Sequence, residues 1–132
     1  MEHESRPESA RPSFDELVAL TRRVIAGFEE REQRPWGVEA SLIELIKQVG
    51  DLARHVMMAE SYYLPDRSSD ARYATTTERV GDELADILYC VIRLADLYGI
   101  DLAEAQVSAR RRELDYLGLG DEPRPPAPSH DR

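Results

Sequence analysis

The chain has 132 residues, of which 42% are hydrophobic and 33% charged, and a formal net charge of -9. This length suits one domain with its own core, and the acidic balance argues against a broad nucleic-acid surface. A single cysteine excludes an intrachain disulfide and favours a reducing compartment. No apolar run approaches the roughly 18 residues of a membrane span, and the polar N-terminus lacks a signal-peptide core. We therefore expect a soluble, cytoplasmic protein that contacts neither membrane nor nucleic acid.

The two ends of the chain differ in composition from its middle. Residues 1–12 and 118–132 are polar and contain most of the prolines, so we expect both segments to be disordered. Residues 13–117 carry the periodic apolar pattern and are predicted to form one helical domain.

The first predicted helix begins at Ser13, because Glu16 three residues later completes a capping-box pattern. We expect this helix to end before Arg34-Pro35, since the residue before a proline disfavours helical geometry. Trp36 lies in the connection that follows. Its indole ring is expected to close the end of a helical bundle, with stacking on a nucleobase as the alternative.

A second helix is predicted from about residue 38 to residue 61. Its apolar face is formed by residues at helical spacing, namely Leu42, Leu45, Ile46, Val49, Leu52, Ala53, Val56 and Met57. Glu44, Gln48, Asp51 and His55 align on an opposite polar ridge. We expect this ridge to be solvated, with His55 at the surface; the alternative is that it carries the ligands of a site.

Residues 62–76 are predicted to form a long loop that contains three tyrosines, two arginines and a proline. Loops of this length inside a compact domain are often functional. Arg67 and Arg72 are candidate phosphate ligands, and the tyrosine rings are candidates for stacking on a base. The alternative is that the tyrosines pack the loop down while the arginines are solvated.

Residues 77–99 show the most regular amphipathic pattern and predict a helix that is capped by Thr75 or Thr76. Glu83 falls at the edge of the apolar arc, and Asp86 lies just outside it on the same side. A carboxylate at an apolar border is costly unless a cation or a metal compensates its charge. Cys90, within the same helix, is expected to be a small core residue.

A fourth helix is predicted to follow Asp101, with Glu104 completing its capping pattern. Four amphipathic helices without a predicted strand favour an all-α fold, a four-helix bundle. Two adjacent helices of such a bundle would bring Asp51 toward Glu83 and Asp86. Hard carboxylate oxygens suit Mg²⁺ or Mn²⁺, which can bind polyphosphate and activate water.

The segment from Gly81 to Leu102, with its Glu83-x-x-Asp86 motif, resembles the MazG-like branch of the all-α nucleoside triphosphate pyrophosphohydrolases. Residues 45–53, LIKQVGDLA, are similar to the stretch that carries the family's other motif, E-E-x-x-E. The preceding RPWGVEASLIEL resembles the family's Trp-containing entry to that helix. The resemblance implies a MazG-like four-helix bundle that assembles as a homodimer or a higher oligomer.

The resemblance also implies which residues form the site. Asp51, Glu83 and Asp86 would be the catalytic residues and would hold Mg²⁺ or Mn²⁺. Lys47 and Gln48 stand where the family has two glutamates. Gln48 would contribute a neutral carbonyl to the metal, and Lys47 would either repel a metal or contact phosphate directly.

The function implied by the resemblance is Mg²⁺-dependent hydrolysis of a normal or modified nucleoside triphosphate to a monophosphate and pyrophosphate. The alternative, favoured by the Lys47 and Gln48 replacements, is a catalytically impaired helical dimer that binds a nucleotide or a protein partner. A third alternative is an unrelated structural bundle whose acidic pairs are solvated.

Overall fold

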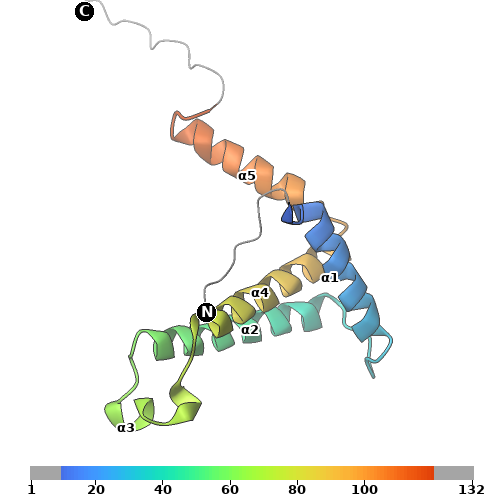
Figure 1. The fold of residues 1–132 in the computed structure, drawn as a ribbon. Coiled ribbons are helices and arrows are strands. Elements are labelled where there is room, and N and C mark those ends of the chain that lie inside the picture. The colour runs from blue at the N-terminus through green and yellow to red at the C-terminus, as the bar shows by residue number, and fades with distance from the viewer. Residues whose placement is uncertain (1–9, 121–132) are drawn as a thin grey trace, which may run out of the picture. The chain divides into compact units, whose positions relative to one another are not determined.

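The computed structural model describes residues 10–120, and every regular element within that range is helical. The elements are α1 (Phe14–Glu29), α2 (Val38–Ala59), the single turn α3 (Pro65–Ser68), the 3₁₀ turn η2 (Ala71–Tyr73), α4 (Thr77–Leu97) and α5 (Leu102–Tyr116) (Figure 1). The predicted all-α class is confirmed. Most of the two ends expected to be disordered, 1–12 and 118–132, lies outside the described residues.

Three of the predicted helix starts coincide with observed caps. The side chains of Ser13, Thr76 and Asp101 accept hydrogen bonds from backbone N–H groups three residues later, at the beginnings of α1, α4 and α5. Each bond satisfies a donor that the first turn of a helix leaves without a partner. At the other end of α4, Gly99 adopts a positive φ of 64°, a conformation that glycine accepts without a steric penalty.

Helices α2 and α4 run antiparallel and side by side, and α1 packs on α4 (Figure 1). The α1–α4 contact includes a two-bond ion pair, in which the Arg22 guanidinium donates to both carboxylate oxygens of Asp96 at 3.0 and 2.8 Å. These three helices belong to a unit that ends at Gly99.

Helix α5 belongs to a second unit, which begins at Ile100. Its apolar residues are few, and Val107 and Leu114 among them are exposed. An ion pair between Arg110 and Glu113, one turn apart, lies on its surface. No helix between residues 10 and 120 is both long enough and apolar enough to cross a membrane.

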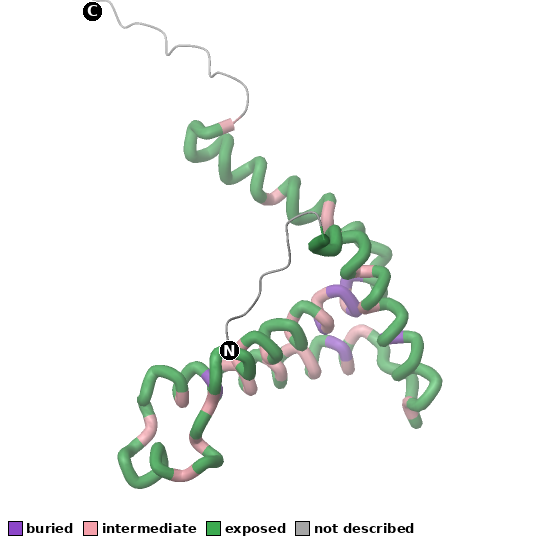
Figure 2. Tube along the Cα trace, in the orientation of Figure 1, coloured by how far each residue is buried: buried purple, intermediate pink, exposed green. Residues whose placement is uncertain are grey.

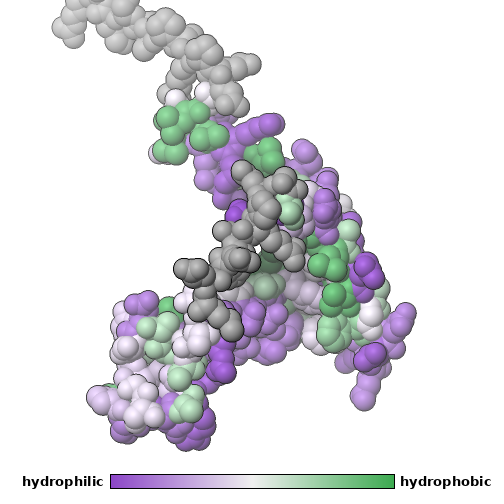
Figure 3. All heavy atoms as spheres, viewed as in Figure 1, coloured by the Kyte–Doolittle hydropathy of each residue, from purple (hydrophilic) through white to green (hydrophobic). Residues whose placement is uncertain are grey.

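The hydrophobic core of the described chain is small. The buried hydrophobic residues are Ile25, Cys90, Ile92 and Ala95, and they come from α1 and α4 (Figure 2). The prediction that Cys90 is a small core residue is confirmed. Hydrophobic side chains remain at the surface along α1 as well, where Figure 3 shows them between hydrophilic neighbours.

The faces of α2 are oriented differently from the prediction of a solvated polar ridge. His55 is buried, and Glu44, Gln48 and Asp51 are half-buried, because this ridge packs toward α4. Residues of the apolar face, including Val49 and Val56, are exposed instead. The prediction of His55 as a surface residue is therefore wrong: polar partners on the α4 side satisfy its ring, so burial costs it little.

Candidate functional site

A cavity of about 430 Å³ lies between α1, α2 and α4. Its walls combine apolar and aromatic side chains with carboxylates and one guanidinium. The lining residues are Val24, Phe28, Glu32, Trp36, Glu44, Gln48, Asp86, Tyr89, Cys90 and Arg93. A concave site with aromatic walls and a few polar groups is the usual form of a small-molecule binding site.

Arg93 organises one end of this cavity. It is 6% exposed, and its Nη2 donates to Glu32 Oε1 at 2.6 Å. The guanidinium carbon lies 5.1 Å from the centre of the Trp36 ring, a cation–π contact. Burial alone would lower the pKa of Arg93, but the hydrogen bond and the negative charge of Glu32 raise it. The guanidinium therefore stays charged and holds the α1–α2 connection against α4.

Aromatic and sulfur groups form the apolar part of the cavity. Phe28 and Tyr89 meet edge to face with ring centres 6.5 Å apart. Burial raises the pKa of the Tyr89 hydroxyl, and burial followed by the nearby charges of Glu44 and Asp86 raises the pKa of the Cys90 thiol. Both groups are therefore neutral near pH 7.

The polar ridge of α2 is held together by Glu44. Its Oε1 accepts a hydrogen bond from Gln48 Nε2 at 3.0 Å and lies 3.0 Å from Lys47 Nζ. The hydrogen bond and the charge of Glu44 raise the pKa of the exposed Lys47 amine. Lys47 and Gln48 thus both interact with the same neighbouring carboxylate.

Glu83 lies at the α2–α4 contact, where His55 faces it. Glu83 Oε1 is 3.4 Å from His55 Nε2, and His55 Nδ1 is 2.7 Å from Thr75 Oγ1, within hydrogen-bond distance. The other oxygen, Glu83 Oε2, is buried without a hydrogen-bond partner. A buried carboxylate oxygen in that state is suited to receive a cation.

The other predicted metal ligands do not gather around Glu83. Asp86 lines the cavity, and Asp51 is half-buried on α2. Across residues 10–120, no three His, Cys, Asp or Glu side chains come together as a group able to hold a metal ion. Glu83 Oε2 could therefore serve as one ligand of a metal ion. The other ligands would have to come from side chains that lie apart from it in this structure.

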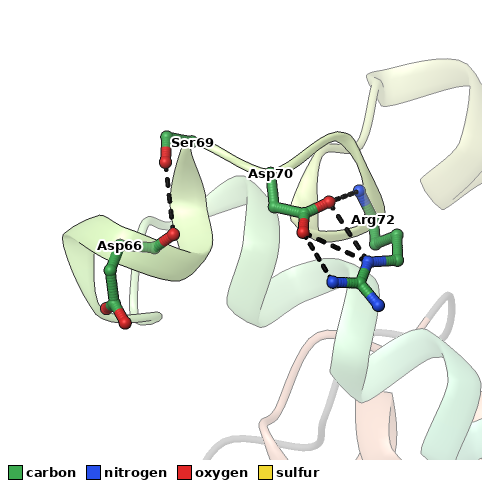
Figure 4. A network of polar contacts seen from close by, with 4 residues as sticks. All are labelled: Asp66, Ser69, Asp70 and Arg72. Carbon is green, nitrogen blue, oxygen red and sulfur yellow. Dashed lines mark hydrogen bonds and ion pairs between the residues drawn. The ribbon is translucent and has the colours of Figure 1, made fainter.

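The two arginines of residues 62–76 have partners within that segment. The Arg72 guanidinium and backbone N–H donate to the Asp70 carboxylate, with the shortest contact at 2.7 Å (Figure 4). This hydrogen bond lowers the pKa of Asp70 and raises that of Arg72. Arg67 lies 6.0 Å from the ring centre of Tyr73. Neither arginine lines the cavity, and the segment contains α3 and η2, so it is less irregular than predicted.

Sequence reasoning missed several residues that line the cavity, above all Arg93, Glu32 and Tyr89. A signal for two of them is present in the sequence, because Asp86, Tyr89 and Arg93 follow one another at helical spacings of three and four. The partner of Arg93 could not be inferred, since Glu32 is separated from it by 61 positions along the chain.

Comparison of the chain with protein-family models, with curated proteins and with solved structures gave no match.

Proposed function

We propose that this protein binds a nucleoside triphosphate in the cavity between α1, α2 and α4 and hydrolyses it to a monophosphate and pyrophosphate with Mg²⁺ or Mn²⁺. The observation that carries the proposal is the cavity itself, which places aromatic rings beside the carboxylates of α2 and α4. The resemblance of the Glu83-x-x-Asp86 segment to MazG-like pyrophosphohydrolases supports the same reading.

The base of the nucleotide would occupy the aromatic part of the cavity. Trp36, Phe28 and Tyr89 offer ring faces and edges there, and stacking on such rings is tolerant of base identity. Arg93 already engages both Glu32 and Trp36, so its role is to position the Trp36 ring. The position of the Trp36 ring in the cavity lining therefore favours Trp36 as a stacking residue.

The phosphates would lie toward the carboxylates of α4. Glu83 and Asp86, with Asp51 and the carbonyl of Gln48 from α2, would hold the metal ion if these side chains, which lie apart in this structure, came together around it. A bound divalent cation supplies charge neutralisation for the phosphates and an activated water. The orphaned oxygen of Glu83 supports the assignment of that residue.

The test is a pyrophosphate-release assay with normal and modified nucleoside triphosphates and saturating Mg²⁺ or Mn²⁺. We expect turnover by the wild type and at least a ~100-fold loss for Asp86→Asn, because removing a charged group at the reacting phosphate costs several kcal/mol. Glu78→Gln, an exposed carboxylate on the same helix, is the matched control and should keep full activity. Absence of turnover with every nucleotide would overturn the catalytic proposal.

One observation favours a second function, nucleotide binding without hydrolysis. Lys47 and Gln48 both bind Glu44, so the first half of the family's metal motif is engaged in contacts of its own. Calorimetry would then detect nucleotide binding of similar affinity with Mg²⁺ and with EDTA. A strict metal requirement would count against this function.

We also propose that the protein works as a homo-oligomer in the cytoplasm. The small core and the exposed apolar residues of α2 support self-association. The free thiol of Cys90 is compatible with a reducing compartment.

A further inference from the structure

The cavity between α1, α2 and α4 contains more negative than positive charge. Its lining includes the carboxylates of Glu32, Glu44 and Asp86 and one cation, the Arg93 guanidinium. Arg93 Nη2 donates to Glu32 Oε1 at 2.6 Å, and both side chains are nearly buried, so they form a closed and neutral pair. Among the lining residues, no second cation balances the charges of Glu44 and Asp86.

The amine of Lys47, just outside the lining, does not cancel this negative charge. Lys47 Nζ lies 3.0 Å from Glu44 Oε1, but its side chain is exposed and solvent screens its charge. The thiol of Cys90, which lines the cavity, senses the balance: Glu44 and Asp86 raise its pKa by more than Lys47 and Arg93 lower it. The electrostatic potential beside Cys90 is therefore negative.

The Glu44 carboxylate also keeps the capacity to accept further hydrogen bonds. Gln48 Nε2 and Lys47 Nζ both contact its Oε1, so that among residues 10–120 no side chain donates to its Oε2. Gln48 donates from its amide nitrogen in this contact, and its carbonyl oxygen remains an acceptor. A ligand that donates N–H groups therefore fits this wall of the cavity better than a ligand that accepts.

Aromatic rings form other walls of the cavity. Phe28 and Tyr89 meet edge to face there, and Trp36 lines the same space. Arg93 lies over the Trp36 ring at 5.1 Å, yet Trp36 is still 37% exposed, so the ring retains surface for a ligand. Aromatic rings beside carboxylates attract a flat cation, because the face of an aromatic ring carries partial negative charge.

We propose that the base of the preferred nucleotide is a purine that is alkylated on a ring nitrogen and therefore positively charged, as in 7-methylguanine. This inference rests on the nucleotide function proposed above and names its substrate class. The flat cation would stack on the aromatic rings, and its N–H and amino groups would donate to Glu44. Asp86 is assigned to the metal ion, so Glu44 is the carboxylate that distinguishes a charged base from a neutral one. The net charge of -9 favours a free nucleotide over a polynucleotide.

The test uses nucleosides, which carry no phosphates, so that neither metal binding nor hydrolysis affects the result. Trp36 is the single tryptophan of the chain, and its fluorescence reports a ligand stacked in the cavity. The full chain is titrated in EDTA at pH 6, where the methylated base keeps its N–H protons. We expect saturable quenching by 7-methylguanosine, with at least ~10-fold tighter binding than that of guanosine, which differs by one methyl group and one charge.

Two variants separate the charge of the cavity from the charge of the whole chain. Glu44→Gln removes the local charge but keeps an acceptor for Gln48 and Lys47, and it should reduce the preference for 7-methylguanosine to about threefold or less. Glu78→Gln is the matched control, because it changes the net charge equally at an exposed position of α4. The preference of this control should remain that of wild type.

Equal affinity of wild type for the two nucleosides, no saturable quenching by either, or an unchanged preference in Glu44→Gln would overturn the proposal. A capped RNA oligonucleotide that binds more tightly than 7-methylguanosine would overturn the assignment to a free nucleotide. The pyrophosphohydrolase proposal fails separately, because an enzyme for neutral nucleotides would still release pyrophosphate. A strong preference for 7-methylguanosine without turnover of its triphosphate would support the substrate class and refute hydrolysis alone.

Discussion

His55 and Glu83 illustrate how polar residues are accommodated inside this chain. His55 reaches Thr75 with one ring nitrogen and Glu83 with the other, and both of its partners are only partly exposed. The sequence marks Glu83 as a carboxylate that needs a compensating partner, and the imidazole is in place to be that partner. Such a buried pair adds little to the free energy of unfolding. Removing one member lowers that free energy much more, because the other charge is then buried without a partner.

The first prediction concerns this pair. We expect His55→Ala to lower the free energy of unfolding by about 2–4 kcal/mol, since it leaves Glu83 buried without a partner and opens a cavity. Urea denaturation followed by circular dichroism measures the change. Thr75→Val, which removes only the hydroxyl contact, should cost about 1 kcal/mol. Equal losses for the two variants would contradict this account.

The second prediction concerns Cys90, whose pKa is raised mainly by burial. We expect the native thiol to react with iodoacetamide at pH 8 at least ~10-fold more slowly than the same thiol in urea, because little thiolate forms and access is restricted. A raised pKa also means that this thiol's contribution to stability is present below the ordinary thiol value near 9 and is lost as pH rises further. Equal rates in folded and unfolded protein would refute the prediction. A nucleotide in the cavity should slow the reaction again, since Cys90 lines it.

At the scale of the elements, α4 connects the described parts of its unit. α2 packs along one side of it, α1 crosses it near Asp96, and Arg93 ties it to the α1–α2 connection. The Arg93–Glu32 ion pair is nearly buried, with side-chain exposures of 7% and 12%, whereas the Arg22–Asp96 pair is largely open to solvent.

The third prediction compares these two ion pairs. Glu32→Ala should lower the free energy of unfolding by about 3–5 kcal/mol, because the Arg93 guanidinium stays charged and loses its buried partner. Asp96→Ala should cost no more than about 1 kcal/mol, since its partner is solvated. Chemical denaturation of the two variants beside wild type measures both values. A larger loss for Asp96→Ala would contradict the assigned roles.

At the scale of the whole molecule, the core of the described residues is small, and apolar residues of α2 and α4 such as Val49 and Leu84 are exposed. The stability of one chain therefore depends on what covers these two helices. The fourth prediction follows from this dependence. If a second copy provides the cover, the thermal midpoint should rise by a few degrees for each tenfold increase in chain concentration, because association stabilises the folded state by mass action. Differential scanning fluorimetry from 1 to 100 µM measures it. A midpoint independent of concentration would count against self-association.

The helices themselves could be predicted from the sequence, because their determinants are local. Ser13, Thr76 and Asp101 cap helices as expected, and apolar spacing locates α2 and α4 to within a few residues. The candidate site was predicted only in part. Glu83 lies at the α2–α4 contact, and Asp86 and Gln48 line the cavity. Arg67 and Arg72, in contrast, contact residues of their own segment.

The sequence by itself determined which residues share a face of each helix, because helical periodicity is a property of the chain. Only the tertiary structure decided which face of α2 meets α4: the polar ridge with Gln48 and His55 faces inward, and Val49 and Val56 remain exposed. The physical reason is that helical periodicity shows which residues share a face, but not which other element that face packs against. Partners that are far apart in the chain, such as Glu32 for Arg93 and His55 for Glu83, make that choice.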